Sequence, residues 1–317
     1  MTVVDAHVHV IVPELLRAAA PQEAWRPDVR REDGAQVVEL DGRPIRSATG
    51  EFVDVDRILE ENGADRVLLA PWVPLLFPDA DAADALPRLR LQNEALAGIV
   101  GERVSGLGAV PLQQPELAAQ ELADLMGGPL SGVEVPARVG GLYLGDDRFA
   151  PFWAVAEATG ALVFIHPSTR GFAGPGEYYL WNTVGNPLET TITAAHMVMA
   201  GIMERHPGLK VLLAHGGGAV LALRGRLRHA HAALAPAQAR LSDSPEASLR
   251  RFYYDTVTHD ATLLRALVEF AGAEQVVLGS DFPFDMADPR PADTVRAAGL
   301  GPDAEAAILG RNLEALL

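Results

Sequence analysis

Residues 161–167 read ALVFIHP, a short apolar run that ends in a histidine and a proline. Such a run between two helical patterns is typical of a strand buried in a parallel sheet. Seven similar runs lie along the chain, at residues 3–9 (VVDAHVH), 66–72 (RVLLAPW), 104–111 (VSGLGAVP), 132–136 (GVEVP), 210–216 (KVLLAHG), 252–257 (FYYDTV) and 275–281 (QVVLGSD). The sequence therefore predicts eight strands.

Most of these runs are separated by alanine- and leucine-rich stretches with helical spacing, such as residues 115–126 and 149–159. Alternation of strand and helix predicts a parallel α/β sheet, and eight units in 317 residues match the size of a single-domain (β/α)8 TIM barrel. A doubly wound open sheet is the competing architecture, but it more often has a glycine-rich loop after its first strand. No such loop follows residues 3–9, so we favour the barrel over the open sheet. We expect it to form one domain that spans residues 1–317.

Residues 13–56 interrupt the alternation, because they contain no long helical pattern. Within them, QVVELDGRPIR (36–46) predicts a hairpin around Asp41-Gly42, which is a favoured tight-turn pair. We expect this segment to be an insertion after the first strand that lies over the barrel mouth.

Composition narrows the functional class. The net charge of −16 argues against nucleic acid as a main partner, because phosphate binding needs a basic surface. The chain has no apolar run of about 20 residues and no signal-peptide pattern at its start, so we expect a cytoplasmic protein that does not bind membranes. It has no cysteine, so any metal must be held by His, Asp or Glu.

Histidines and one aspartate occupy the ends of the predicted strands. His7 and His9 are two residues apart on the first strand, so both side chains point to the same side. His166 ends the fifth strand, His215 the sixth and Asp281 the eighth. In a barrel these ends converge on one mouth, and burying such polar groups is costly unless they have partners. A divalent cation would satisfy them, so we predict a metal centre.

The pattern favours a single ion. Two-metal barrel hydrolases often use a lysine on the fourth strand, whereas that strand has none here, and the only lysine, Lys210, begins the sixth strand. Glu134 or Glu14 could add an oxygen ligand, although a structural role fits both better. Nitrogen and oxygen ligands suit zinc, with manganese or iron as alternatives. We expect His215 to be an acid or base beside the metal, with a ligand role as the alternative.

Four motifs in this order, DAHVH (5–9), FIHP (164–167), LLAHGGG (212–218) and LGSDFPF (278–284), resemble the amidohydrolase superfamily. More narrowly, the chain resembles its decarboxylating branch, typified by 2-amino-3-carboxymuconate-6-semialdehyde decarboxylase. The resemblance implies a mononuclear zinc site with His7, His9, His166 and Asp281 as ligands. It also implies that His215 activates a water or handles a proton.

The same resemblance implies that Arg46 and Arg226 bind substrate carboxylates. Arg226 would do so across the interface of a homodimer. Planar guanidinium groups bind carboxylates with two parallel hydrogen bonds, which is consistent with these roles.

The chain departs from the family pattern after the fifth strand, where Ser168 replaces a tryptophan. This makes the pocket wall smaller and more polar. Arg170 is a candidate for an additional anion contact, and Trp72 for an aromatic wall of the substrate pocket.

The leading functional hypothesis is non-oxidative decarboxylation of a small unsaturated or aromatic carboxylic acid. The metal would stabilise negative charge as CO2 leaves, and His215 would help to protonate the carbon. The alternative is hydrolysis of a lactone, amide or related bond, with Asp281 or His215 accepting a proton, or hydration on the same scaffold. A non-catalytic scaffold protein without metal is the third hypothesis.

Overall fold

The computed structural model describes residues 2–40, 43–168 and 174–317, and only the backbone of residues 43–48. All eight predicted strands are present. They are β1 (Val4–Val10), β5 (Arg66–Pro71), β6 (Val104–Gly106), β7 (Gly132–Pro136), β10 (Leu162–His166), β11 (Lys210–Leu213), β12 (Tyr253–Asp255) and β13 (Val276–Val277).

These strands pair in parallel as two sheets, in the orders β1-β5-β6 and β13-β12-β11-β10-β7. Two isolated bridges join the sheets, Gly108 with Val133 and Val8 with Phe282. At the second seam the His9 amide donates to the Phe282 carbonyl over 2.8 Å. The eight strands therefore close into a barrel, which confirms the predicted fold over the open sheet.

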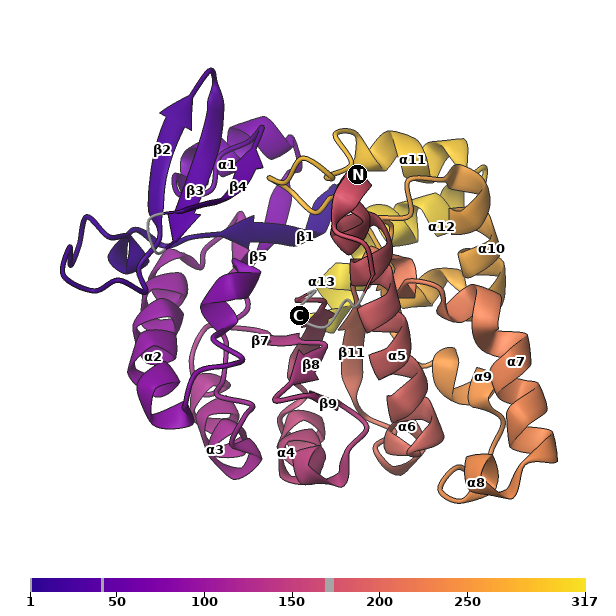
Figure 1. The fold of residues 1–317 in the computed structure, drawn as a ribbon. Coiled ribbons are helices and arrows are strands. Elements are labelled where there is room, and N and C mark those ends of the chain that lie inside the picture. The colour runs from indigo at the N-terminus through magenta and orange to yellow at the C-terminus, as the bar shows by residue number, and fades with distance from the viewer. Residues whose placement is uncertain (1, 41–42, 169–173) are drawn as a thin grey trace.

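The major helices of the barrel units cover the outside of the strands (Figure 1). They are α1 (Val55–Asn62), α2 (Ala82–Ile99), α3 (Pro115–Leu125), α4 (Ala150–Thr159), α5 (Asn186–Met199), α7 (Val220–Ala233), α10 (Ala261–Ala271) and α11 (Pro291–Ala297). Shorter helices are α6 (Ile202–Arg205), α8 (Ala235–Gln238), α9 (Pro245–Leu249), α12 (Pro302–Ala306) and α13 (Asn312–Leu316). The stretches with helical spacing at 115–126 and 149–159 thus correspond to α3 and α4.

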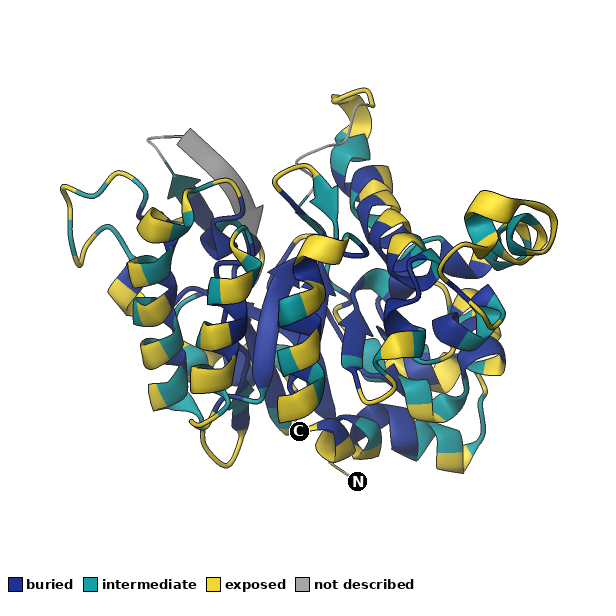
Figure 2. Ribbon diagram, turned by 90° about the horizontal axis from the view of Figure 1, so that it is seen from below, coloured by how far each residue is buried: buried dark blue, intermediate teal, exposed yellow. Residues whose placement is uncertain are grey.

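Alternation along the strands divides the core into two layers. On β10, Val163 and Ile165 face outward and pack in the same cluster as Trp153 of α4. Leu162 and Phe164 face inward and belong to a separate inner cluster. Figure 2 shows the result, with buried strands at the centre and helices whose outer faces are exposed.

The end of the barrel where the strands begin is covered by the last helix. Leu313 and Leu316 of α13 join the inner cluster with Val4. Lys210 donates from Nζ to the Leu316 carbonyl over 2.8 Å. The sole lysine therefore lies at the end opposite the mouth, as its place at the start of β11 predicts.

The insertion after β1 forms a small antiparallel sheet of β2 (Asp28–Glu32), β3 (Ala35–Leu40) and β4 (Arg43–Ala48). The predicted hairpin is β3–β4, and its turn residues Asp41 and Gly42 lie outside the described residues. The sequence analysis missed β2, because its residues are mostly charged and give no hydrophobic alternation.

Contacts near the carboxyl end of β1 place the insertion at the rim of the mouth. The Ile11 amide donates to the Phe52 carbonyl over 2.8 Å. The ring of Phe52 also packs on Phe284, which follows the eighth strand, with centroids 5.3 Å apart.

Among the described residues, no helix combines the length and apolar character that crossing a lipid bilayer requires.

Candidate metal centre

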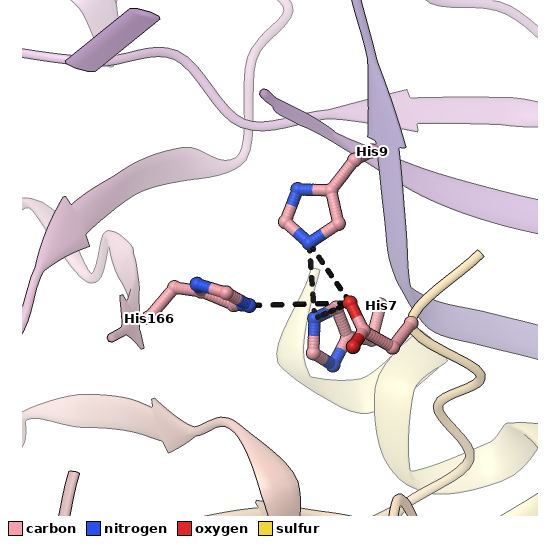
Figure 3. A group of neighbouring side chains, drawn as sticks. His7, His9 and His166 are labelled. Carbon is pink, nitrogen blue, oxygen red and sulfur yellow. Dashed lines mark hydrogen bonds and ion pairs between the residues drawn. The ribbon is translucent and has the colours of Figure 1, made fainter. Parts of the chain in front are cut away.

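Four predicted side chains meet at the carboxyl end of the barrel strands, namely His7, His9, His166 and Asp281 (Figure 3). Their candidate ligand atoms all lie within 4.8 Å of one another, and all four residues are buried. Nε2 of His7 and Nε2 of His9 are 3.1 Å apart. Oδ1 of Asp281 lies 3.3 Å from Nε2 of His7, 3.4 Å from Nε2 of His9 and 4.0 Å from Nε2 of His166.

Each imidazole is oriented through its other nitrogen. Nδ1 of His7 pairs with Oδ2 of Asp255 over 2.6 Å. Nδ1 of His9 donates to the Pro71 carbonyl over 3.0 Å, and Nδ1 of His166 to the Pro167 carbonyl over 2.9 Å. A proton on Nδ1 leaves the lone pair of Nε2 free, which is the tautomer that a metal ligand needs.

The donor set fits a single divalent ion. A tetrahedral ion with bonds of about 2.0–2.1 Å to nitrogen separates its ligand atoms by about 3.4 Å, close to the three shortest distances here. Nε2 of His166 and Oδ1 of Asp281 are buried, and neither has a hydrogen-bond partner among the described residues. Buried polar atoms of this kind need a partner, and a cation between them would supply one.

In the metal-free protein, two of the four groups are held in their charged forms, His7 as a cation and Asp281 as an anion. Burial disfavours the His7 cation, but Asp281 and Asp255 outweigh burial and raise the pKa of His7 to about 10. Burial alone would raise the pKa of Asp281, yet the charge of His7 and the hydrogen bond of His215 hold it well below its ordinary value. Burial lowers the pKa of His9 and, with the nearby imidazoles, holds the pKa of His166 well below its ordinary value.

His215 lies beside this group rather than in it. It follows β11, and its Nε2 is 3.3 Å from Oδ2 of Asp281. Its side chain is 12% exposed, whereas that of His7 is fully buried. His215 and Asp281 both have left-handed backbones, with φ of +56° and +64°. Non-glycine residues rarely adopt this conformation, and those that do cluster at functional sites.

Asp255, at the end of β12, is a residue that the sequence analysis missed. Besides pairing with His7, it accepts hydrogen bonds from the amides of His215 (2.9 Å) and Gly216 (2.7 Å). A single carboxylate therefore orients one candidate metal ligand and fixes the loop that carries His215. The signal is present in FYYDTV, where an aspartate ends a strand as Asp281 does.

Replacing Asp255 with asparagine is expected to weaken metal binding by about 10- to 100-fold, the usual cost of losing the partner of a ligating histidine. Competition with a chromogenic chelator measures the affinity. Asp260→Asn is the matched control, because Asp260 lies on the same loop and caps α10, which asparagine also does. Equal affinity of Asp255→Asn and wild type would exclude this role.

The other candidate oxygen ligands are not in the group. Glu134 is 1% exposed inside the barrel, and its Oε1 lies 4.0 Å from Nδ1 of His9, the nitrogen that faces away from the cluster. Burial raises the pKa of Glu134 well above its ordinary value, which favours the neutral form of the group. Glu14 is exposed on the insertion. Neither residue belongs to the four-residue group.

The predicted substrate-binding residues fall in different places. Trp72 is 1% exposed and packs beside Phe52 in the core. Arg226 is exposed on α7. Arg46 lies in β4, opposite Val38, but its side chain is outside the described part of the chain, as is all of Arg170.

A cavity of about 290 Å³ opens beside His215 and Asp281. Its walls combine apolar side chains (Val257, Leu263 and Met286) with polar ones (Asn182, Asn186 and His259). Sequence reasoning named neither group, because it cannot assign side-chain directions in loops. The cavity gives a small organic molecule access to the candidate metal centre.

Comparison with known proteins agrees with this geometry. A model of the amidohydrolase family matches residues 4–317. The chain is 32% identical over 267 residues to 2-amino-3-carboxymuconate-6-semialdehyde decarboxylase of Dictyostelium discoideum, covering 81% of this chain and 74% of that protein. It is 37% identical over 234 residues to 6-methylsalicylic acid decarboxylase of Penicillium expansum, covering 66% of this chain and 67% of that protein. The structure matches 5-carboxyvanillate decarboxylase of Sphingomonas paucimobilis with a TM-score of 0.83 and 26% identity, over 99% of this chain and 98% of that one.

Proposed function

The chain belongs to the amidohydrolase family, and we propose that it is a metal-dependent, non-oxidative decarboxylase of a small aromatic or unsaturated carboxylic acid. The observation that carries this proposal is the group of three histidines and one aspartate at the end of a cavity, in a chain whose relatives are decarboxylases. Hydrolysis or hydration on the same scaffold is the second candidate.

In this proposal His7, His9, His166 and Asp281 hold one divalent ion. When bound, the ion supplies a positive charge that polarises a substrate oxygen and stabilises the negative charge left as CO2 departs. Zinc suits the three imidazoles and the carboxylate, with manganese or iron(II) as alternatives.

The chain's own residues then handle the proton. The bond between the carboxyl carbon and its neighbour breaks, and the electron pair stays on the neighbouring carbon. His215 lies at the edge of the cavity beside Asp281 and delivers a proton to that carbon. The products are CO2 and a compound that carries hydrogen in place of the carboxylate. Arg46, Arg226 and Arg170 are proposed to orient the substrate's anionic groups.

The test is release of CO2 from a panel of aromatic and muconate-type acids by the metal-loaded protein. We expect one CO2 per substrate consumed and a product one carbon shorter. A product that retains every carbon would contradict decarboxylation and favour the hydrolase.

Metal affinity is expected to rise with pH. His7 must be neutral to bind the ion, but its pKa of about 10 keeps it protonated at pH 7 in the metal-free protein, whereas His9 and His166 are already neutral and Asp281 is already ionised. Binding therefore expels about one proton, and the apparent affinity should increase about tenfold per pH unit between pH 6 and 9. Calorimetry in buffers of different ionisation enthalpy measures the number of protons released when the metal binds. Finding no proton release would contradict a protonated His7 in the metal-free protein.

We also propose that the protein is a homodimer. Val184, Leu188 and Ile192 form a stripe at helical spacing along α5 and the turn before it, and each is 41–43% exposed. Leu223 of α7 is 37% exposed, and Arg226 lies one turn further along the same helix. A second copy packed on this surface would bury the stripe and bring Arg226 close to the other subunit.

Light scattering coupled to gel filtration tests the dimer, with Leu188→Glu as the disrupting variant. A monomeric wild type would exclude the dimer.

Co-expression of His215→Ala and Arg226→Ala subunits tests whether Arg226 acts in its own subunit or in the other subunit of the dimer. If the arginine acts across the interface, the mixed dimer contains one intact site and is more active than either parent. If the mixture is as impaired as its parents, the arginine acts within its own subunit.

A further inference from the structure

The strand β1 contains a β-bulge beside the first candidate metal ligand. Asp5 lies opposite Val67 of β5, and Val8 lies opposite Leu69. Three steps along β1 therefore match two steps along β5, so β1 carries one extra residue between these pairs. Bulges of this kind redirect the side chains that follow them, and they are frequent beside active sites.

The bulge determines which side chains of β1 face the barrel interior. Ala6 packs in the inner cluster, whereas Val8 belongs to the same outer cluster as Ile58 of α1. Without the extra residue, the even-numbered positions would continue to face inward, and His7 and His9 would point out of the barrel. The bulge therefore turns both imidazoles into the group seen in Figure 3.

The carboxylate of Asp5 binds the backbone at this bulge. Asp5 is 0% exposed, and its Oδ1 accepts hydrogen bonds from the amides of His7 (3.0 Å) and Ser280 (3.1 Å). Its Oδ2 accepts from the Ser280 hydroxyl and from Nδ2 of Asn62, the last residue of α1, which is 2.8 Å away. These four donors fill the roughly four acceptor positions of a carboxylate.

The same carboxylate reaches the backbone that carries the fourth candidate ligand. Ser280 directly precedes Asp281, whose backbone is left-handed with φ of +64°. The Ser280 hydroxyl also accepts from the amide of Phe282 over 3.1 Å, so its contacts hold the chain before and after Asp281. All four donors to Asp5 are neutral, and a carboxylate buried among neutral groups is costly. Such a residue is expected where a neutral side chain could not make the same contacts.

We propose that Asp5 is a positioning residue for the metal centre. It holds the bulge that turns His7 and His9 inward, and it fixes the chain on which Asp281 lies. Asp5 acts through backbone amides, whereas Asp255 orients an imidazole directly. This inference rests on the four-residue metal centre of the proposed function, but not on the reaction that the centre catalyses.

The experiment measures Co2+ binding to wild type, Asp5→Asn and Asp5→Ala by competition with a chromogenic chelator. The visible absorption of the bound Co2+ reports its coordination geometry, and the melting temperature of the metal-free protein reports the fold. Asparagine keeps one acceptor oxygen and places an NH2 group against the remaining donors, whereas alanine keeps no acceptor. Asp65→Asn is the matched control, because the Asp65 carboxylate accepts from the amide of Val3 over 2.7 Å, beside the other end of β1.

We expect Asp5→Asn to bind Co2+ about 10- to 100-fold more weakly than wild type and to change the visible spectrum, with at least as large a loss in Asp5→Ala. Asp65→Asn should match wild type in both measurements. A folded Asp5→Asn variant with wild-type affinity and spectrum would overturn the proposal, even if its melting temperature falls, because Asp5 would then stabilise only the fold.

If neither Asp5 variant folds, Ser280→Ala and Ser280→Thr decide the question. Alanine removes the hydroxyl that links Asp5 to the chain around Asp281, and threonine restores it. We expect alanine to weaken Co2+ binding about tenfold or more and threonine to return it to the wild-type level. Unchanged affinity in Ser280→Ala would then overturn the proposal. If no acid releases CO2 while the Asp5→Asn variant shows the weaker binding, the proposed decarboxylation fails and this inference stands.

Discussion

Replacing His215 with alanine is expected to lower kcat by at least ~100-fold while the metal content stays at that of wild type. The reason is geometric, because the imidazole lies at the cavity and contacts Asp281, but does not belong to the four-residue group. Removal of the proton carrier should slow protonation of the carbon without removing a ligand. Elemental analysis and steady-state kinetics on the same preparation measure both quantities.

His206→Ala is the matched control, because His206 is a histidine that pairs with Glu157 at the opposite end of β11. It should change neither activity nor metal content. If His215→Ala loses the metal, His215 is a ligand, and the proposed division of roles is wrong.

Replacing His9 with alanine is expected to have the larger effect on the metal. The variant removes one of three imidazoles and leaves Nε2 of His7 without its neighbour at 3.1 Å. We expect metal content to fall from about one ion per chain to below about 0.1, and activity to fall with it. Glu134→Gln is the control, since Glu134 is buried near His9 but lies outside the group. Full metal content in His9→Ala would remove the basis of the proposed function.

The strands and the metal group could be predicted from the sequence because both depend on simple periodicity. An apolar run followed by a histidine or aspartate marks the carboxyl end of a parallel strand, and a barrel brings those ends together. The same rule would have identified Asp255. The direction of the Trp72 ring could not be predicted, because proximity to a strand end does not show whether a ring points into the cavity or into the neighbouring core.

Other features depend on information that the sequence does not contain. The strand β2 is charged and is identified only by its pairing with β3. Asn182 is an ordinary polar residue in the sequence, and only the turn of the chain around it places it at the cavity.

The seam between the first and last strands has a consequence for how the protein matures. His7 and Asp281 come from nearly opposite ends of the chain, and the Asp281 amide donates to the His7 carbonyl over 2.9 Å where the barrel closes. During synthesis, a chain that does not yet contain its last strand also lacks the Asp281 carboxylate. Such a chain cannot assemble the full four-residue site. The full group of four ligands can therefore assemble only after residue 281 has been synthesised, and an ion bound there would connect the first and last strands and slow reopening of the barrel.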